Sequence, residues 1–178
     1  MAAPMTTPIE IDVWQGEIAE LEVDALVVGA SESLFMTGGQ AASVKRRGGP
    51  DIERAAVQQG PIAPGNVVVT AGGRLAAPYV IHAVAVGHDR IADPDRIIAA
   101  VRAAFAVAEP LQLRRMAIGL LGAEHGAFTA EDAATALVAA IEGAAAGTPV
   151  DSVVIATAHP NETHAVGEAL ARHHAAAR

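Results

Sequence analysis

The stretch that decides the fold runs from residue 25 to residue 40 and reads ALVVGASESLFMTGGQ. It opens on four consecutive apolar residues, a pattern typical of a strand that is covered on both faces of a sheet. A loop of mostly small and hydroxyl-bearing residues follows, and Gly38 and Gly39 precede the helical pattern that begins at Gln40. Paired glycines at a helix start let the backbone approach a phosphate or carboxylate closely. The stretch therefore predicts a buried strand that leads, through a candidate anion-binding loop, into a helix.

Strand and helix patterns alternate along the rest of the chain. Further strands are predicted at residues 9–13, 67–70, 79–84, 116–121 and 153–157. Helices are predicted at residues 40–58 with a break at 48–50, from Asp93-Pro94 to Ala108, from Thr129 onward, and from residue 160 toward the C-terminus. Asp93 and Thr129 are suitable N-cap residues, and Asp132 completes a capping box with Thr129. Such alternation predicts a layered α/β fold.

Length and composition narrow the class of protein. The chain has 178 residues, which suits one domain over residues 1–178 with a flexible start at 1–7. The absence of cysteine excludes disulfides, thiolate metal sites and thiol nucleophiles. Mean hydropathy is +0.33, but alanine supplies much of it, and no run approaches the ~18 apolar residues of a membrane span. The first residues lack the pattern of a signal peptide. We expect a soluble, cytoplasmic protein without a membrane partner.

The charge balance argues against nucleic acid as a partner. The formal net charge is −8, whereas binding to a phosphate backbone needs clustered lysine and arginine. The basic cluster Lys45-Arg46-Arg47 is followed by two glycines and a proline. This arrangement predicts a helix end, because cations there interact favourably with the negative pole of the helix dipole.

Two glycine-rich loops follow predicted strands and lead into predicted helices. The first spans residues 29–40, and the second spans residues 120–128 and reads LLGAEHGAF. In open α/β sheets, ligands gather where the carboxyl ends of the strands meet loops of this kind. The two loops are therefore the candidate ligand site.

Several short motifs together resemble those of the macro-domain family. Gly16-Glu17-Ile18 and residues 23–27, VDALV, are similar to that family's Gly-Asp-Ile and Val-Asp-Ala-Ile-Val. Residues 65–70, GNVVVT, and 79–82, YVIH, resemble two of its strands. The resemblance covers most of the chain and is closest between residues 9 and 84. It implies a three-layer α/β/α sandwich around a mixed, mostly parallel sheet. It also implies a cleft for ADP-ribose or a related nucleotide, with no cofactor or metal.

The resemblance implies which residues line that cleft. Glu17 stands where the family has the Asp that binds the adenine amino group, and Ser31 stands where it has an Asn that faces the distal ribose. Phe128 belongs to a loop that lines the same ribose. The ligand-binding residues expected on this basis are Glu17, Ile18, Ser31, Thr37, Gly38, Gly39, Gln40, Gly122, Ala123, Gly126 and Phe128.

The sequence departs from the family pattern at positions that bear on the ligand. Glu17 keeps the carboxylate acceptor of the family's Asp but has a longer side chain. Val28 and Ser31 stand in place of two asparagines, and Gln40 stands at a position that is usually apolar. Glu124 brings a carboxylate to the loop where the diphosphate docks. At ~4 Å such a contact costs about 4 kcal/mol at an effective dielectric constant of 20. Either Glu124 points to solvent, or the ligand is not a dianion of this kind.

Few residues qualify as catalytic groups. Glu124 and His125 are candidates for an acid/base pair, although adjacent residues in a loop need not face each other. His82 lies within an apolar strand and is predicted to be a hydrogen-bonded structural histidine. Trp14 is predicted to pack in the core or at its rim. No spacing indicates a Ser-His-Asp triad or a metal site.

Three functions remain open. The first is a binding module or weak hydrolase for ADP-ribose or a related nucleotide. The second is a macro-like domain that has lost this ligand and binds another small molecule or a protein partner. The third is an enzyme of unrelated chemistry that uses Glu124 and His125. Alanine-rich helices at residues 97–108 and 133–146 would also allow a homo-oligomer.

Overall fold

The computed structural model describes residues 8–123 and 128–176. Within them the strands form one six-stranded sheet in the order β1-β6-β5-β2-β4-β3. All neighbouring strands are parallel except β3 and β4, which are antiparallel. The strands are β1 (Glu10–Gln15), β2 (Ala25–Ala30), β3 (Val67–Ala71), β4 (Tyr79–Val84), β5 (Arg115–Gly119) and β6 (Ser152–Thr157). The mixed, mostly parallel sheet expected from the sequence is confirmed.

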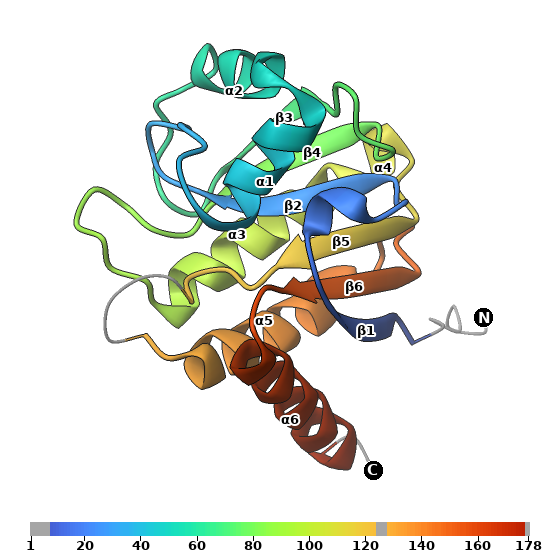
Figure 1. Cartoon of the computed structure of the whole chain (residues 1–178). Coiled ribbons are helices and arrows are strands. Elements are labelled where there is room, and N and C mark those ends of the chain that lie inside the picture. Colours follow the sequence, from blue (N-terminus) through green and yellow to red (C-terminus); the bar gives the residue numbers. More distant parts are fainter. Residues whose placement is uncertain (1–7, 124–127, 177–178) are drawn as a thin grey trace.

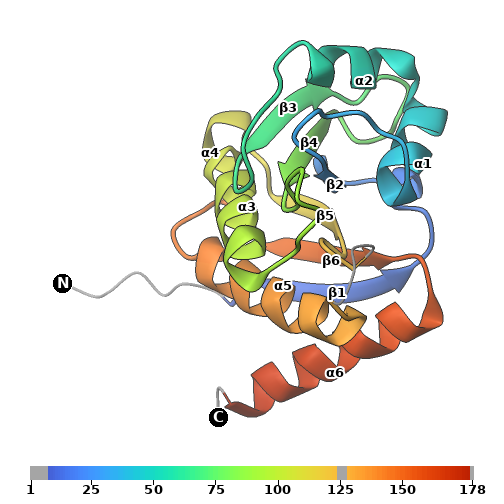
Figure 2. The same cartoon turned by 90° about the vertical axis from the view of Figure 1, so that its left-hand side faces the viewer.

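Helices cover both faces of this sheet (Figures 1 and 2). The helices are η1 (Ile18–Glu20), α1 (Gly39–Gly48), α2 (Pro50–Val57), α3 (Pro94–Ala106), α4 (Ala108–Leu111), α5 (Ala130–Ala145) and α6 (Pro160–Ala176). The first three pack on one face, and α3 and α5 pack on the other, where α6 lies against α5 and β1. The molecule is therefore a three-layer α/β/α sandwich, as expected.

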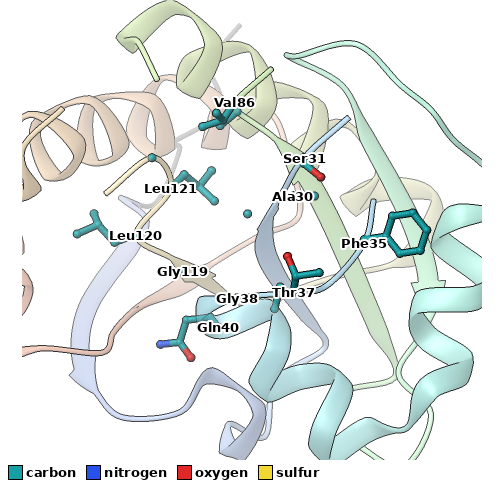
Figure 3. Close-up of a pocket in the computed structure, with 14 residues that line it drawn as sticks. Ala30, Ser31, Phe35, Thr37, Gly38, Gln40, Val86, Gly119, Leu120 and Leu121 are labelled. Atoms are coloured by element: carbon teal, nitrogen blue, oxygen red, sulfur yellow. The ribbon is translucent and has the colours of Figure 1, made fainter. Parts of the chain in front are cut away.

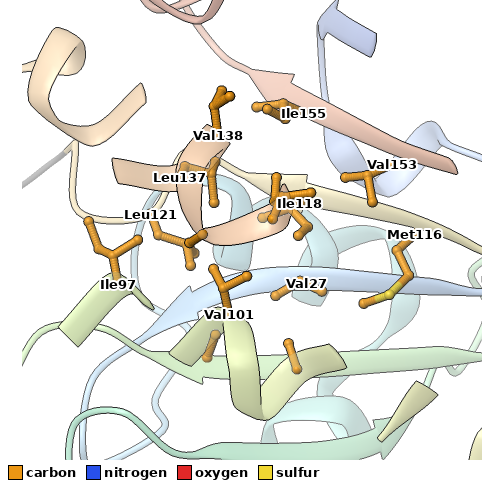
Figure 4. Close-up of a cluster of buried hydrophobic side chains, with 14 of the residues drawn as sticks. Val27, Ile97, Val101, Met116, Ile118, Leu121, Leu137, Val138, Val153 and Ile155 are labelled. Atoms are coloured by element: carbon orange, nitrogen blue, oxygen red, sulfur yellow. The ribbon is translucent and has the colours of Figure 1, made fainter. Parts of the chain in front are cut away.

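The larger part of the core lies between the sheet and α3, α5 and α6. Figure 4 shows Val27, Ile118 and Ile155 of the sheet facing Val101 of α3 and Leu137 of α5. All five side chains are buried. The continuous apolar run of β2 is explained by this arrangement, because Val27 serves this core while Leu26 and Val28 serve the core under α1.

The local signals in the sequence correspond to real element boundaries. The helix break at residues 48–50 separates α1 from α2, and Thr129 with Asp132 forms the predicted capping box of α5. Several boundaries differ. Helix α3 ends at Ala106 and Ala108 begins the short helix α4, strand β5 ends at Gly119 and not at residue 121, and strand β1 extends to Gln15. Trp14 packs against the core under α1, and a Cβ on Gly16 would lie 2.3 Å from its ring. In the part of the chain that is described, no helix is long and apolar enough to cross a membrane.

His82 is a buried polar residue in the middle of β4. Its Nε2 lies 3.0 Å from the Thr70 hydroxyl on β3, whereas its Nδ1 has no hydrogen-bond partner. The predicted structural histidine is thus confirmed in its burial, but only one of its two nitrogens is hydrogen-bonded. Burial disfavours the charged ring and lowers the pKa of His82 to about 4.

This lowered pKa makes the stability of the protein depend on pH. In the unfolded chain, His82 takes up a proton as pH falls below about 6.5. In the folded protein, the same ring stays neutral until pH approaches its lowered pKa of about 4. Stability therefore decreases as pH falls through this window. We expect a loss of about 1.5 kcal/mol between pH 6.5 and pH 5. Urea unfolding at several pH values measures it.

His82→Gln provides the control, because it removes the titrating ring and should flatten the slope between pH 6.5 and pH 5. An equal slope in the two proteins would show that His82 does not govern this part of the profile.

Candidate functional site

A pocket opens where the carboxyl ends of β2 and β5 meet the N-terminus of α1 (Figure 3). Its volume is about 160 Å³, which is below the ~300–1,000 Å³ of typical small-molecule sites. None of the described residues that line it carries a charge. The lining residues are Gly29, Ala30, Ser31, Phe35, Thr37, Gly38, Gln40, Ala41, Ala85, Val86, Gly119, Leu120, Leu121 and Gly122.

The first turn of α1 forms one wall of this pocket. Gly38 is its N-cap, no side chain caps its N–H groups, and its first turn contains no acidic residue. The other end of α1 carries Lys45, Arg46 and Arg47, as the sequence predicted. Because the N-terminal N–H groups and the helix dipole both favour negative charge, this turn is suited to an anion.

Helices α3 and α5 differ from α1 at this turn. The first turn of α3 is capped by Asp93, whose Oδ1 accepts from the Arg96 N–H at 2.9 Å. The first turn of α5 is capped by Thr129, whose Oγ1 accepts from the Asp132 N–H at 3.1 Å. Those helices satisfy a first-turn N–H internally. In α1 the corresponding groups are left for water or a ligand.

Two glycines at the pocket are needed for their backbone conformation. Gly39 has φ 55° and Gly122 has φ 85°, both in the left-handed region that other residues adopt at a cost. A Cβ on Gly122 would also lie 3.1 Å from Ala92 and 3.4 Å from Phe128. Gly38 differs, since its φ is −150° and a Cβ there would meet no atom within 4 Å.

The loop between β2 and α1 is held in place by α2. The Met36 N–H donates to Glu53 Oε2 at 2.7 Å, and Lys45 Nζ donates to the other carboxylate oxygen at 2.7 Å. These two contacts, the lysine first, lower the pKa of Glu53. The side chain of Leu34, a residue of the same loop, is fully buried. The pocket wall that carries Thr37 and Gly38 is thus anchored on both sides.

The loop between β4 and α3 lies on the other side of the opening. His88 Nε2 of this loop pairs with Glu32 Oε2 of the first loop at 2.7 Å. Arg96 binds both carboxylate oxygens of Asp89 at 2.8 and 2.9 Å, and this hydrogen bonding lowers the pKa of Asp89 to about 2. The two loops are therefore connected directly to each other and anchored to α3.

The structure brings together some of the residues expected from the sequence. Ser31, Thr37, Gly38, Gln40 and Gly122 line the pocket. Five others lie outside its lining, namely Glu17, Ile18, Gly39, Ala123 and Phe128. Three more, Glu124, His125 and Gly126, fall outside the described residues. For all three groups, the assignment to ligand binding or catalysis stays a prediction.

Glu17 is engaged in ion pairs. Its Oε1 lies 2.7 Å from Arg46 Nη2 and its Oε2 lies 2.6 Å from Arg47 Nε, both near the end of α1. Arg47 also pairs with Glu20 at 2.5 Å. The hydrogen bond from Arg47 is the first cause of a lowered Glu17 pKa, so this carboxylate is charged near neutral pH. The adjacent Ile18 N–H donates to Gln40 Oε1 at 3.0 Å.

Sequence reasoning missed one aromatic residue of the site. Phe35 lines the pocket with 54% of its surface exposed, and Figure 3 shows it on the side of the opening opposite Leu120 and Gln40. Phe128 instead packs against the core next to Gly122. The signal was a large apolar residue in the middle of a glycine-bounded loop, where no core position was expected. Among the described residues, no group of histidine and carboxylate side chains could hold a metal.

Comparison with known proteins identifies the family. The Macro domain pattern matches residues 27–137. The chain belongs to the macro-domain family. A macro domain-containing protein of Cupriavidus necator is 37% identical over 147 residues, covering 78% of this chain and 84% of that protein. An uncharacterized protein of Mycobacterium tuberculosis is 35% identical over 133 residues, and the match spans 75% of this chain but only 37% of that longer protein.

Solved macrodomains share the fold at lower identity. The Trypanosoma brucei macrodomain in complex with ADP-ribose superposes with a TM-score of 0.80 at 21% identity, covering 90% of this chain and 69% of that one. The Oceanobacillus iheyensis macrodomain with ADP gives a TM-score of 0.80 at 18% identity, covering 90% and 89%.

Proposed function

We propose that the pocket of this macro domain binds ADP-ribose or a related nucleotide derivative, with the diphosphate at the first turn of α1. The observation that carries the proposal is this turn itself. It has a glycine at its N-cap and another at its start, no capping side chain and no acidic residue, and it faces a pocket whose described lining has no charge. Backbone N–H groups in such a site bind phosphate without the help of a cation.

Family membership supports the same ligand class. The structures of the related macrodomains from Trypanosoma brucei and Oceanobacillus iheyensis contain ADP-ribose and ADP, respectively. The binding of these ligands is known for those two proteins and not for the present chain. For the present chain they indicate which nucleotides to test first.

Hydrolysis is a separate part of the proposal. In the described lining, the side chains with polar groups are Ser31, Thr37 and Gln40, and none is a general acid or base near neutral pH. The candidates for such a group are Glu124 and His125, which the sequence suggests as an acid/base pair and which lie outside the described residues. Release of ADP-ribose from O-acetyl-ADP-ribose, followed by chromatography, would support turnover, and an intact substrate after long incubation would leave a binding module.

Calorimetric titration with ADP-ribose tests the binding proposal, with AMP and ADP as comparison ligands. We expect a dissociation constant in the micromolar range. No heat at millimolar ADP-ribose, measured at several temperatures because the enthalpy can pass through zero, would contradict the proposal. That result would favour a macro domain that binds another small molecule or a protein partner.

A further inference from the structure

The segment of residues 35–37 forms part of the pocket wall just before α1. Phe35 and Thr37 line the pocket (Figure 3), and the side chain of Met36 between them is buried. No backbone–backbone hydrogen bond joins this segment to another described residue. Its backbone is held instead by the hydrogen bond from the Met36 N–H to Glu53 Oε2, at 2.7 Å. The position of two lining residues therefore depends on a side chain that lies outside the pocket.

Glu53 is firmly placed for this role. It lies in α2, which packs against the sheet and α1 through the buried side chains of Ile52 and Ala56. Its own side chain is 16% exposed, and its second oxygen, Oε1, accepts from Lys45 Nζ of α1 at 2.7 Å. Hydrogen bonds to a charged carboxylate are stronger than those between neutral groups. One carboxylate thus joins α2, α1 and the segment between β2 and α1.

The charge of Glu53 also has to be compatible with an anionic ligand, because a carboxylate without a cation near the pocket would repel a phosphate. Lys45, the only lysine of the chain, supplies that cation. Asp51 of the same helix shows the contrast. Its side chain is 80% exposed and pairs with Arg54, one turn away on α2. Glu53 is therefore the carboxylate of α2 that is built into the pocket wall.

We propose that Glu53 is a positioning residue of the pocket, which holds residues 35–37 in the arrangement that binds the ligand. The inference rests on the proposed function. Without the Glu53 carboxylate, the segment populates this arrangement for a smaller fraction of the time. The apparent affinity then falls by the same factor, because the ligand has to order the segment when it binds.

Calorimetric titration of wild type, Glu53→Ala and Glu53→Gln with ADP-ribose tests the proposal. Glu53→Ala should bind about tenfold more weakly than the wild type, the equivalent of one hydrogen bond of ordinary net strength. Glu53→Gln keeps an oxygen that can accept from the Met36 N–H, so its affinity should stay within about threefold of the wild type. Should the alanine variant be poorly folded, Glu53→Leu removes the acceptor while keeping most of the side-chain volume.

Amide hydrogen exchange, measured by NMR without ligand, tests the positioning directly. The Met36 N–H should exchange at least about tenfold faster in Glu53→Ala than in the wild type, and it should remain protected in Glu53→Gln. A role of Glu53 in overall stability alone would not confine the change to this segment.

Asp51→Ala is the matched control, because it removes a carboxylate and an ion pair from the same helix without touching the segment. Its affinity and its Met36 exchange should equal those of the wild type. Wild-type affinity in Glu53→Ala, or an equal loss in the alanine and glutamine variants, would overturn the inference alone. A wild type that binds no ADP-ribose would overturn the proposed function and the inference with it.

Discussion

Replacing Gly38 with glutamate should weaken ADP-ribose binding at least ~100-fold while the protein stays folded. A carboxylate about 4 Å from a diphosphate costs about 4 kcal/mol at an effective dielectric constant of 20. The substitution fits the backbone, because Gly38 has φ −150° and a Cβ there meets no atom within 4 Å. An acidic residue at a helix N-terminus is moreover favourable in the absence of ligand. Calorimetric titration measures the loss, and the melting temperature should change by less than about 3 °C.

The choice of Gly38 over its neighbour follows from the backbone. Gly39 has φ 55°, so glutamate there would strain the chain and mix a loss of stability with a loss of binding. Gly143→Glu is the matched control, since it adds the same charge on an exposed position of α5 where a Cβ also meets nothing within 4 Å. Equal affinity in the Gly38 and Gly143 variants would place the diphosphate elsewhere.

Replacing Phe105 with alanine should lower the free energy of unfolding by about 3–5 kcal/mol, more than any other substitution considered. The Phe105 side chain is 1% exposed and belongs to α3, within the core that joins the sheet to α5. Removing its ring leaves a cavity that the surrounding backbone cannot fill. The melting temperature should fall by roughly 10 °C, given ~2–4 °C per kcal/mol for a protein of this size. Differential scanning calorimetry measures the shift.

Phe35→Ala is the control for this prediction, because it removes the same ring from a position that is 54% exposed. Its stability should stay within about 0.5 kcal/mol of the wild type. Similar melting temperatures for the two variants would mean that the ring of Phe105 contributes no more than an exposed ring, contrary to its burial.

Local patterns in the sequence were sufficient to predict the six strands and the longer helices of the fold, but not the short helices η1 and α4. The apolar run of β2, the glycine break between α1 and α2, and the Thr129–Asp132 capping box act over a few residues, so their signals are complete within short windows. The glycine-rich turn before α1 was predicted in the same way. Five expected site residues, Ser31, Thr37, Gly38, Gln40 and Gly122, accordingly line the pocket.

The remaining features of the site depend on side chains far apart in the sequence. Gln40 bonds residues 22 and 24 positions away, and Glu17 pairs with arginines 29 and 30 positions away. These partners meet because η1 and α1 pack against each other on one face of the sheet. Similarly, Phe35 and Phe128 are both aromatic residues in loops, and only their packing distinguishes the exposed ring from the one beside the core.

The sequence by itself determined the strands, the longer helices and the glycine-rich turn before α1, because periodicity, capping and glycine conformation are local properties. Tertiary structure alone decided which polar groups stay open to a ligand and which are satisfied internally. A side-chain amide or carboxylate has several possible partners in the sequence, and the packing of segments brings only some of them within hydrogen-bonding distance.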